Sequence, residues 1–479
     1  MRWLVLALSM LISSVSCASV MGYDEARHLL NRTGFSASEA KVQEFSRLTR
    51  QQAVTKLLDD VRMVAQIPPP ASLGEWVPLS SLKNKTAEER KVLFKEALQQ
   101  GIDLRAWWYQ EMLDTPSPLT ERMTLFWHNH FVSSQEKVKS PLLMYQQNVL
   151  LRYYALGNFG ELLHAVSKDP AMVLYLDGVS NRKERPNENF AREVMELFTL
   201  GEGAYSEQDV KEAARAFTGW SIDRESGQFK FYPRTHDDGQ KVVLGQRGQF
   251  DGDAVLDILL GQPQTAELIT RKLWQEFISP TPDTADIKRM AEVFRASGYD
   301  IKTLMRALLT SGAFYAKQNR AVLVKSPVEF IIGTLQQFDI QPENMRPFVL
   351  VGNSLGQDVF DPPNVKGWPG GASWINSSTL LVRMQFMQRV VQRQEMPQAP
   401  IALAFKGRKD NVMGAQQMLN TIHFDSEQWV NQFKGTLPQQ QAQVERLLLA
   451  SVPVNKPQAS GTNLEFIRQL VLDPAYLVK

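Results

Sequence analysis

Helical periodicity runs through almost all of this 479-residue chain and constrains its fold more than any other feature. In most segments apolar residues recur at the spacing of amphipathic helices. Helix-capping pairs also recur, since Thr86 is followed three positions later by Glu89 and Ser206 by Asp209. The sequence therefore predicts a mainly α, large multi-helix globular fold. The predicted helices cover residues 86–112 (with a break near Gly101), 117–130, 141–156, 187–200 and 206–217, and the pattern resumes from 254 to 393 with breaks.

One segment departs from this pattern. Residues 228–246 contain two β-prone runs on either side of Asp238-Gly239. An Asp-Gly pair between such runs is a strong hairpin signal. We therefore expect one small β-hairpin insertion at about residues 228–246.

The predicted domain organisation has three parts. Residues 1–18 form a signal peptide, 19–394 the main helical domain, and 395–479 a C-terminal helical part packed on it. Glu395 to Pro400 marks the boundary. The Pro/Gly-rich segment 361–374 is predicted to be an ordered loop rather than a linker, because its two tryptophans need somewhere to pack.

The N-terminus predicts export. Arg2 precedes an apolar run, Trp3 to Ile12, that is too short to span a bilayer and is followed by small residues. Cleavage after Ala18 and lipid attachment at Cys17 both fit. Cys17 is the only cysteine, so the mature chain has no disulfide. We expect a periplasmic protein, or one anchored through Cys17, with no transmembrane span in the mature chain.

Composition narrows the class of partner. The chain has 53 Lys and Arg against 51 Asp and Glu, a formal net charge of +2, with the two signs interspersed. This balance argues against nucleic acid as the main partner. The common motifs for a serine nucleophile, phosphate cradle, dinucleotide, zinc protease and EF-hand are absent from the sequence.

The first candidate site is the segment FWHNHF, with His128 and His130. Residues that are two positions apart on a helix are rotated by about 200 degrees from each other, so the two imidazole rings would point in different directions. Both can ligate one metal only if the helix ends near His128, which Ser133 and Ser134 favour. The alternative is that a histidine packs and forms hydrogen bonds inside the core.

The second candidate is the helix that starts at Asn187. Its apolar residues cluster on one face, and its polar face carries ion pairs at i,i+4 spacing. This face is either solvated or lies against a cleft, where Glu188 or Glu193 would serve as a metal ligand or general base, with Arg192 beside them.

Two further candidates come from turns. His236 and Asp237 combine imidazole and carboxylate, which suits a divalent cation, although Asp and His are also common in turns for backbone reasons. Trp368 and Trp374 would stack on sugar rings, or they are buried anchors.

Six sequence blocks carry a family resemblance. In order they are LTERMTLFWHNHF from Leu119, ENFAREVMELFTLGEG from Glu188, DVKEAARAFTGW from Asp209, HDDGQKVVLG from His236, KSPVEF from Lys325 and PPNVKGWPGG from Pro362. From about Tyr23 to its end the chain resembles the bacterial family called domain of unknown function 1800. The resemblance implies an exported, largely helical protein. It assigns no activity and no catalytic residue. Members of the family are often encoded beside a second exported family that resembles sulfatases and alkaline phosphatases, which implies a partner of that kind.

Two functions remain open from the sequence. The first is a metal-assisted hydrolase of the cell envelope, using a divalent metal. The second is a non-catalytic protein that works with a neighbouring exported enzyme or binds an envelope polysaccharide through Trp368 and Trp374. The hydrolase requires convergence of residues far apart in the sequence: His128, His130, Glu188, Glu193, His236 and Asp237.

Overall fold

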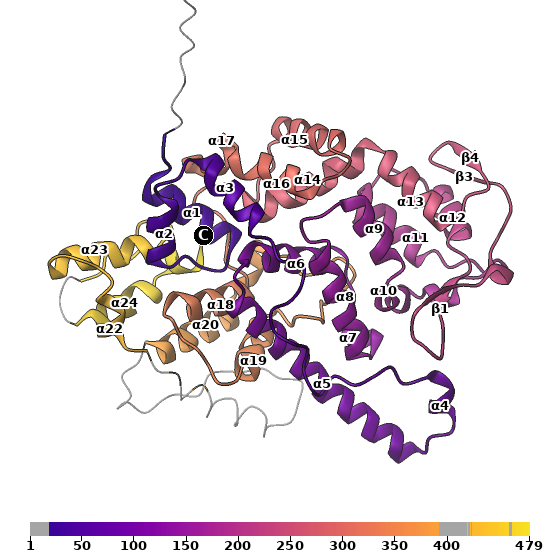
Figure 1. Ribbon diagram of the computed structural model, residues 1–479, viewed down its shortest axis with the longest axis horizontal. Coiled ribbons are helices and arrows are strands. Elements are labelled where there is room, and N and C mark those ends of the chain that lie inside the picture. The colour runs from indigo at the N-terminus through magenta and orange to yellow at the C-terminus, as the bar shows by residue number, and fades with distance from the viewer. Residues whose placement is uncertain (1–18, 392–418, 420–421, 423, 459–461) are drawn as a thin grey trace, which may run out of the picture.

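The computed structural model describes residues 19–391, 419, 422, 424–458 and 462–479. Within these residues helices dominate, and only two short two-stranded sheets form, so the predicted mainly α class is confirmed (Figure 1). The predicted signal peptide, Cys17 and the boundary near residues 395–400 lie outside the described residues.

The first part of the chain forms ten helices among the described residues. They are α1 (Gly22–Thr33), α2 (Glu39–Phe45), α3 (Arg50–Asp59), α4 (Leu79–Lys83), α5 (Ala87–Asp114), α6 (Pro118–His130), α7 (Gln135–Val138), α8 (Pro141–Tyr153), α9 (Phe159–Ser167) and α10 (Pro170–Tyr175). The predicted capping box at Thr86 and Glu89 is present at the start of α5. The break expected near Gly101 is absent, because α5 continues through that residue to Asp114.

The middle of the chain contains all the β-strands of the described residues. Its elements are η1 (Gly178–Ser180), α11 (Asn189–Glu193), the π-helix η2 (Val194–Thr199), α12 (Glu207–Ala216), β1 (Trp220–Ile222), β2 (Phe229–Phe231), η3 (Pro233–Thr235), β3 (Lys241–Val243), β4 (Gln246–Gly248), α13 (Gly252–Gly261), α14 (Pro263–Phe277), α15 (Thr284–Ala296), α16 (Ile301–Thr310), α17 (Gly312–Tyr315) and η4 (Lys317–Asn319).

The β insertion is confirmed, but its predicted turn is wrong. The two runs flanking Asp238-Gly239 do not pair with each other: β2 pairs with β1, and β3 pairs with β4. The tight turn is Leu244-Gly245, where both residues have positive φ, as a two-residue hairpin turn requires. Asp237 instead forms an ion pair with Arg215 of α12, which holds the Asp-Gly segment against that helix.

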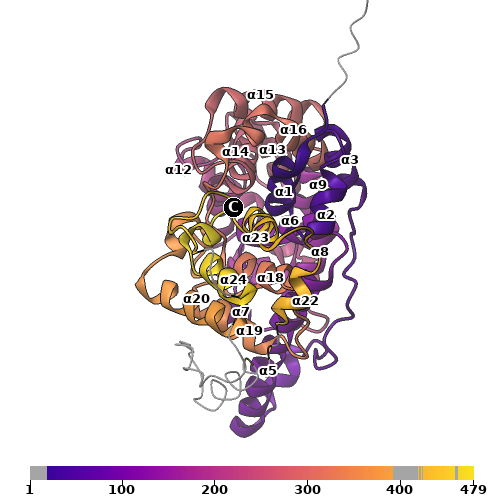
Figure 2. The same ribbon diagram turned by 90° about the vertical axis from the view of Figure 1, so that its left-hand side faces the viewer.

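The last part of the chain packs against the first. Its elements are α18 (Pro327–Gln337), α19 (Arg346–Ser354), η5 (Gly371–Trp374), α20 (Ser377–Val390), α22 (Ser426–Val430), α23 (Leu437–Leu448), α24 (Asn463–Val471) and η6 (Pro474–Leu477). Val324 forms an antiparallel bridge with Val478, and Arg446 pairs with Asp24 of α1. Both ends of the described chain therefore meet in one region (Figures 1 and 2).

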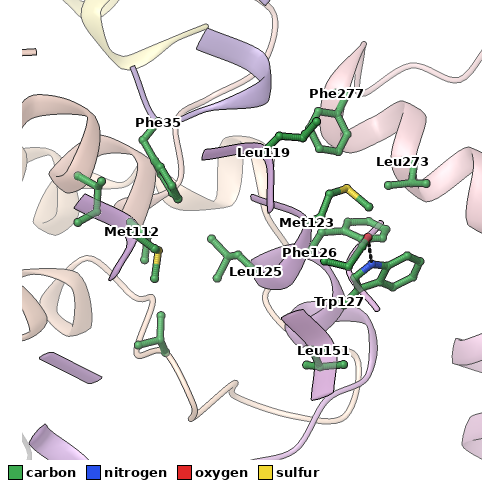
Figure 3. Packing of buried hydrophobic residues seen from close by; sticks show 14 of the residues in the cluster. Phe35, Met112, Leu119, Met123, Leu125, Phe126, Trp127, Leu151, Leu273 and Phe277 are labelled. Atoms are coloured by element: carbon green, nitrogen blue, oxygen red, sulfur yellow. Dashed lines mark hydrogen bonds between the residues drawn. The ribbon is translucent and has the colours of Figure 1, made fainter. Parts of the chain in front are cut away.

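Helix α6 lies at the centre of the core. Almost all of its side chains are buried, including polar ones. Met123, Phe126 and Trp127 pack among residues of α5, α8 and α14 (Figure 3). A helix surrounded on all sides must place its polar groups against partners in other segments. The polar side chains at the end of α6 therefore form hydrogen bonds with segments that are distant in the sequence.

Helix α5 behaves differently along its length. Its second half packs against α8, α18 and α19, whereas its first half projects from the body together with α4 (Figures 1 and 2). On the projecting half, Val92, Phe94 and Leu98 are 49%, 59% and 52% exposed. Among the described residues, none of the helices is both long and apolar enough to cross a bilayer.

Candidate functional site

His128 and His130 lie at the end of α6 and point to different surroundings, because the helix continues through His130. His128 is buried between Trp108, Phe360 and Trp368. Its Nε2 accepts the backbone N–H of Phe360 at 3.0 Å, so the ring is neutral. Burial and the nearby charge of Arg105 lower the pKa of His128 to about 3, which agrees with that state.

Both ring nitrogens of His130 form hydrogen bonds. Lys272 Nζ donates to His130 Nδ1 at 2.9 Å, and His130 Nε2 donates to the carbonyl of Phe198 at 3.2 Å. Lys272 donates a second hydrogen bond to the carbonyl of Leu197 at 3.1 Å. Burial lowers the pKa of Lys272 to about 8, and the pKa of His130 lies well below its ordinary value because of burial and the charge of Lys272.

His236 and Asp237 are engaged locally. His236 is buried, and its Nδ1 donates to the carbonyl of Thr218 at 2.8 Å. Asp237 accepts two hydrogen bonds from Arg215, at 2.8 and 3.1 Å. No three His, Cys, Asp or Glu side chains in the described part of the chain are grouped so that they could hold a metal ion. The structure thus does not assemble the predicted metal ligands, because each is used in a contact that joins two segments.

The polar face of the helix from Asn187 divides into two sets. Arg192 pairs with Glu207 at 2.7 Å and with Glu188 at 3.1 Å, and all three side chains are at least one third exposed. These pairs match the solvated, ion-paired helix face that the sequence left open. Glu188 and Arg192 therefore belong to an ion-paired network on the solvent side of α11.

Glu193 differs from its neighbours. It is half-buried, and within the part of the chain that the structure describes its carboxylate forms no hydrogen bond or ion pair. Burial and the nearby charge of Glu196 raise the pKa of Glu193 above its ordinary value. A raised pKa moves a carboxyl in the direction that favours general acid–base catalysis.

Glu193 lies where the π-helix meets a loop far away in the sequence. Lys366 of that loop contacts Glu196 at 3.8 Å and Glu202 at 3.2 Å. Tyr205 donates to Glu196 at 2.7 Å. We call this region the carboxylate ledge and define it by Glu193, Glu196, Glu202, Asp361, Lys366 and Tyr175.

Tyr175 and Asp361 form the far side of the ledge. Asp361 accepts hydrogen bonds from the Ser134 hydroxyl and from the backbone N–H of Glu136. Burial, together with the charges of Asp361 and Glu193, raises the pKa of Tyr175. Tyr175 therefore stays a neutral phenol beside the two carboxylates.

The helix that carries the ledge changes its winding there. From Val194 to Thr199 the backbone is π-helical, and the N–H of Leu200 bonds to the carbonyl of Met195. The Thr199 hydroxyl donates to the carbonyl of Val194 at 2.5 Å. Such π-helical turns are rare, and they occur frequently at functional sites.

The two tryptophans of the Pro/Gly-rich loop are buried. Trp368 is 4% exposed and Trp374 is 7% exposed. The loop is therefore ordered around its tryptophans, as predicted. With so little ring surface exposed, neither presents a face for stacking on sugar, so their placement matches the alternative of buried anchors.

Several residues of this region were missed by sequence reasoning. Lys366 and Asp361 belong to the Pro/Gly-rich loop, and Lys272 sits in α14 without any motif around it. Asn129 lies between His128 and His130, which were the predicted metal ligands, and was not itself predicted as a site residue. One feature of the sequence could have indicated this site. Three of the blocks that carry the family resemblance meet at the ledge: FWHNHF, ENFAREVMELFTLGEG and PPNVKGWPGG.

The family model described as Protein of unknown function (DUF1800) matches residues 28–478, nearly the whole chain. The chain belongs to this family. The resemblance drawn from the six blocks is thereby confirmed. Neither the curated proteins nor the solved structures include a match to this DUF1800 protein.

Proposed function

We propose that this DUF1800 protein is an exported hydrolase of the cell envelope in which Glu193 acts as general base and general acid. The observation that carries the proposal is Glu193 itself: a half-buried carboxyl with a raised pKa and no hydrogen-bond partner among the described residues. A carboxyl whose pKa is shifted by burial and by a specific neighbouring charge is a candidate functional group.

The proposed step needs only groups of the ledge. Ionised Glu193 accepts a proton from water while the water oxygen bonds to the scissile carbon. The protonated carboxyl then donates that proton to the leaving group as its bond breaks. In this proposal Tyr175 and Lys366 donate hydrogen bonds to the substrate, which is supported by their electrostatic interaction with Glu193.

The charge of the ledge restricts the substrate. Three carboxylates, those of Glu193, Glu196 and Glu202, lie within electrostatic range of the ammonium group of Lys366, and Asp361 lies beside Tyr175. Phosphate and sulfate esters would be repelled by this excess of negative charge. We therefore propose an uncharged or amine-bearing substrate, and because glycosidic bonds need carboxyls on two faces of the sugar, the bond cleaved is an ester or amide carried by an envelope polysaccharide.

The proposed location is the cell envelope, either free in the periplasm or anchored through Cys17. The support is the N-terminal signal pattern of residues 1–18. A sulfatase-like or phosphatase-like exported protein remains the proposed partner, supported by the family's gene neighbours.

The test compares two matched variants of the exported full chain. Carboxylic esters and peptides are offered to the wild type, Glu193→Gln and Glu188→Gln, with neutral glycosides and with sulfate and phosphate monoesters as a contrast. We expect turnover of a neutral substrate that falls about 10²-fold or more in Glu193→Gln and is unchanged in Glu188→Gln. Equal turnover in the two variants would refute the role of Glu193.

Metal analysis tests the earlier histidine hypothesis separately. The metal content of the wild type and of a folded His128→Ala/His130→Ala variant is measured by elemental mass spectrometry. Near-stoichiometric metal that disappears in the variant would restore the metal-assisted mechanism, and it would mean that both rings leave the contacts described above.

A second candidate function is a non-catalytic partner of another exported protein. The stripe on α5 formed by Leu93, Phe94, Ala97 and Leu98 supports it. The same helix face continues, at the same spacing, into buried residues of the second half: Gly101, Leu104, Arg105 and Trp108. An apolar stripe that is covered at one end and bare at the other suits a protein partner.

The partner hypothesis has its own test. A sulfatase-like or phosphatase-like exported protein from the same organism is produced together with the wild type, with Phe94→Ser/Leu98→Ser, or with the control Val454→Ser, an exposed residue elsewhere. We expect the complex to form with the wild type and the control and to be lost with the α5 variant. A complex that survives the α5 changes contradicts this use of the stripe, and self-association in the absence of the partner would identify a second copy as the occupant.

A further inference from the structure

Three consecutive side chains at the end of α6 contact three distant points of the backbone. His128 accepts the N–H of Phe360, Asn129 binds Trp368, and His130 donates to the carbonyl of Phe198. Phe360 and Trp368 flank the loop that carries Asp361 and Lys366. Phe198 belongs to the π-helix that carries Glu196. One helix end therefore contacts both sides of the carboxylate ledge.

Asn129 clamps the loop from both sides of one peptide unit. Its Oδ1 accepts the N–H of Trp368 at 2.7 Å, and its Nδ2 donates to the Trp368 carbonyl at 3.3 Å. The approach is close enough to require Gly367, where an added Cβ would lie 2.2 Å from Asn129 Oδ1. Gly367 also has φ of +79°, which favours glycine.

His130 and Lys272 hold the other side. They donate to the consecutive carbonyls of Phe198 and Leu197, near the end of the π-helical turn, where backbone carbonyls need partners from outside the helix. Lys272 also donates to His130, which joins the two supports into one unit. Both side chains come from helices of the core.

We propose that His128, Asn129 and His130, with Lys272, are positioning residues that fix the spacing between the two sides of the carboxylate ledge. This inference rests on the proposed function of Glu193. Its consequence is specific: Lys366 is held at Glu196 and Glu202 and does not pair with Glu193. A loop free to move would let the ammonium group reach Glu193 and neutralise the base.

Carbodiimide cross-linking of the exported full chain tests the spacing without any turnover. This reagent joins a lysine and a carboxylate that are already in contact, so mass spectrometry reads the Lys366–Glu202 pair directly. The Lys230–Asp223 pair, at 2.6 Å within one hairpin, serves as the internal reference. In Asn129→Ala, we expect the Lys366–Glu202 link to fall about five- to thirtyfold against the reference, as the loss of two hydrogen bonds implies, and a Lys366–Glu193 link to appear.

The histidine arm uses a conservative rescue. His130→Ala should change the same ratio, whereas His130→Gln retains a donor for the Phe198 carbonyl and should restore most of it. An unchanged ratio in folded Asn129→Ala and His130→Ala proteins would overturn the inference. Failure of the proposed function looks different: the cross-links would change as expected, but Glu193→Gln would keep its turnover.

Discussion

Two charged regions of this protein carry opposite charge in opposite surroundings. The carboxylate ledge is partly exposed and rich in acids. The second region, which we call the Glu329 cluster, is largely buried and rich in cations. It consists of Arg32, Arg122, Glu276, Lys325, Glu329, Arg383 and Lys479.

One carboxylate organises the Glu329 cluster. Glu329 accepts the N–H of Ser326 at the start of α18 and forms ion pairs with Arg122 and Lys479. Although burial alone would raise it, the charges of Arg122 and Lys479 hold the pKa of Glu329 well below its ordinary value. Burial disfavours the charged form of the two lysines. It lowers the pKa of Lys325 to about 7 and that of Lys479 to about 8.

Comparing the two regions shows which carboxylates require an ion-pair partner. In the Glu329 cluster, water cannot replace a lost ion-pair partner, so the Glu329 carboxylate is needed for the stability of the fold. At the ledge, solvent reaches the groups, so Glu193 remains ionisable without a partner. The same residue type is ion-paired in one region, as Glu329, and without an ion pair among the described residues in the other, as Glu193.

The largest expected effect comes from breaking the Glu329 cluster. Glu329→Gln leaves Arg122 and Lys479 buried without their shared counter-ion. We expect it to lower the free energy of unfolding by about 3–5 kcal/mol, measured by urea denaturation. A loss below about 1 kcal/mol, the size typical of exposed pairs, would show that the cluster is not different from a surface site.

The pH dependence at Lys272 should give the next largest effect. Its pKa is about 8 in the folded protein and ordinarily 10.5, so between these values the unfolded chain binds more protons and stability rises with pH. Lys272→Met should flatten this rise by up to about 3 kcal/mol, since one pKa unit corresponds to about 1.4 kcal/mol. Denaturation curves at pH 7.5 and 10.5 for both proteins measure it, and identical slopes would contradict the burial of Lys272.

Removing the ring of His130 should have a smaller effect. His130→Ala leaves the Phe198 carbonyl and one Lys272 proton without partners. We expect a loss of about 1–3 kcal/mol, with less loss in His130→Gln. Thermal unfolding of the two variants side by side checks the order, which would reverse if ring packing mattered more than the hydrogen bonds.

The smallest effects separate two glutamates of the same helix. Glu193→Gln removes a carboxylate whose raised pKa makes its ionised form unfavourable in the fold, so it should slightly stabilise the protein at pH 7 and not at pH 4. Glu188→Gln removes an exposed pair and should destabilise it by no more than about 0.5 kcal/mol. Melting temperatures at the two pH values are the measurement, and equal shifts in both variants would remove the distinction between the two sites.

Local features of the fold were predictable from the sequence. The capping boxes at Thr86 and Ser206 form as expected, because their hydrogen bonds lie within one helical turn. The turn at Asp238-Gly239 was not predictable from neighbours alone, because Arg215 of α12 competes for Asp237. A turn predicted from neighbouring residues does not form a hairpin when a side chain from another element, here Arg215, binds one of its residues, here Asp237.

The sequence by itself determined the helical class, the family and the polar character of the helix from Asn187. Only the tertiary structure decided which of its glutamates is paired and which stands free. Helical periodicity assigns both Glu188 and Glu193 to the polar face, and they differ because the loop carrying Lys366 meets the helix beside one of them. Periodicity is a property of neighbouring residues, whereas burial and electrostatic surroundings depend on segments that are brought together only by packing.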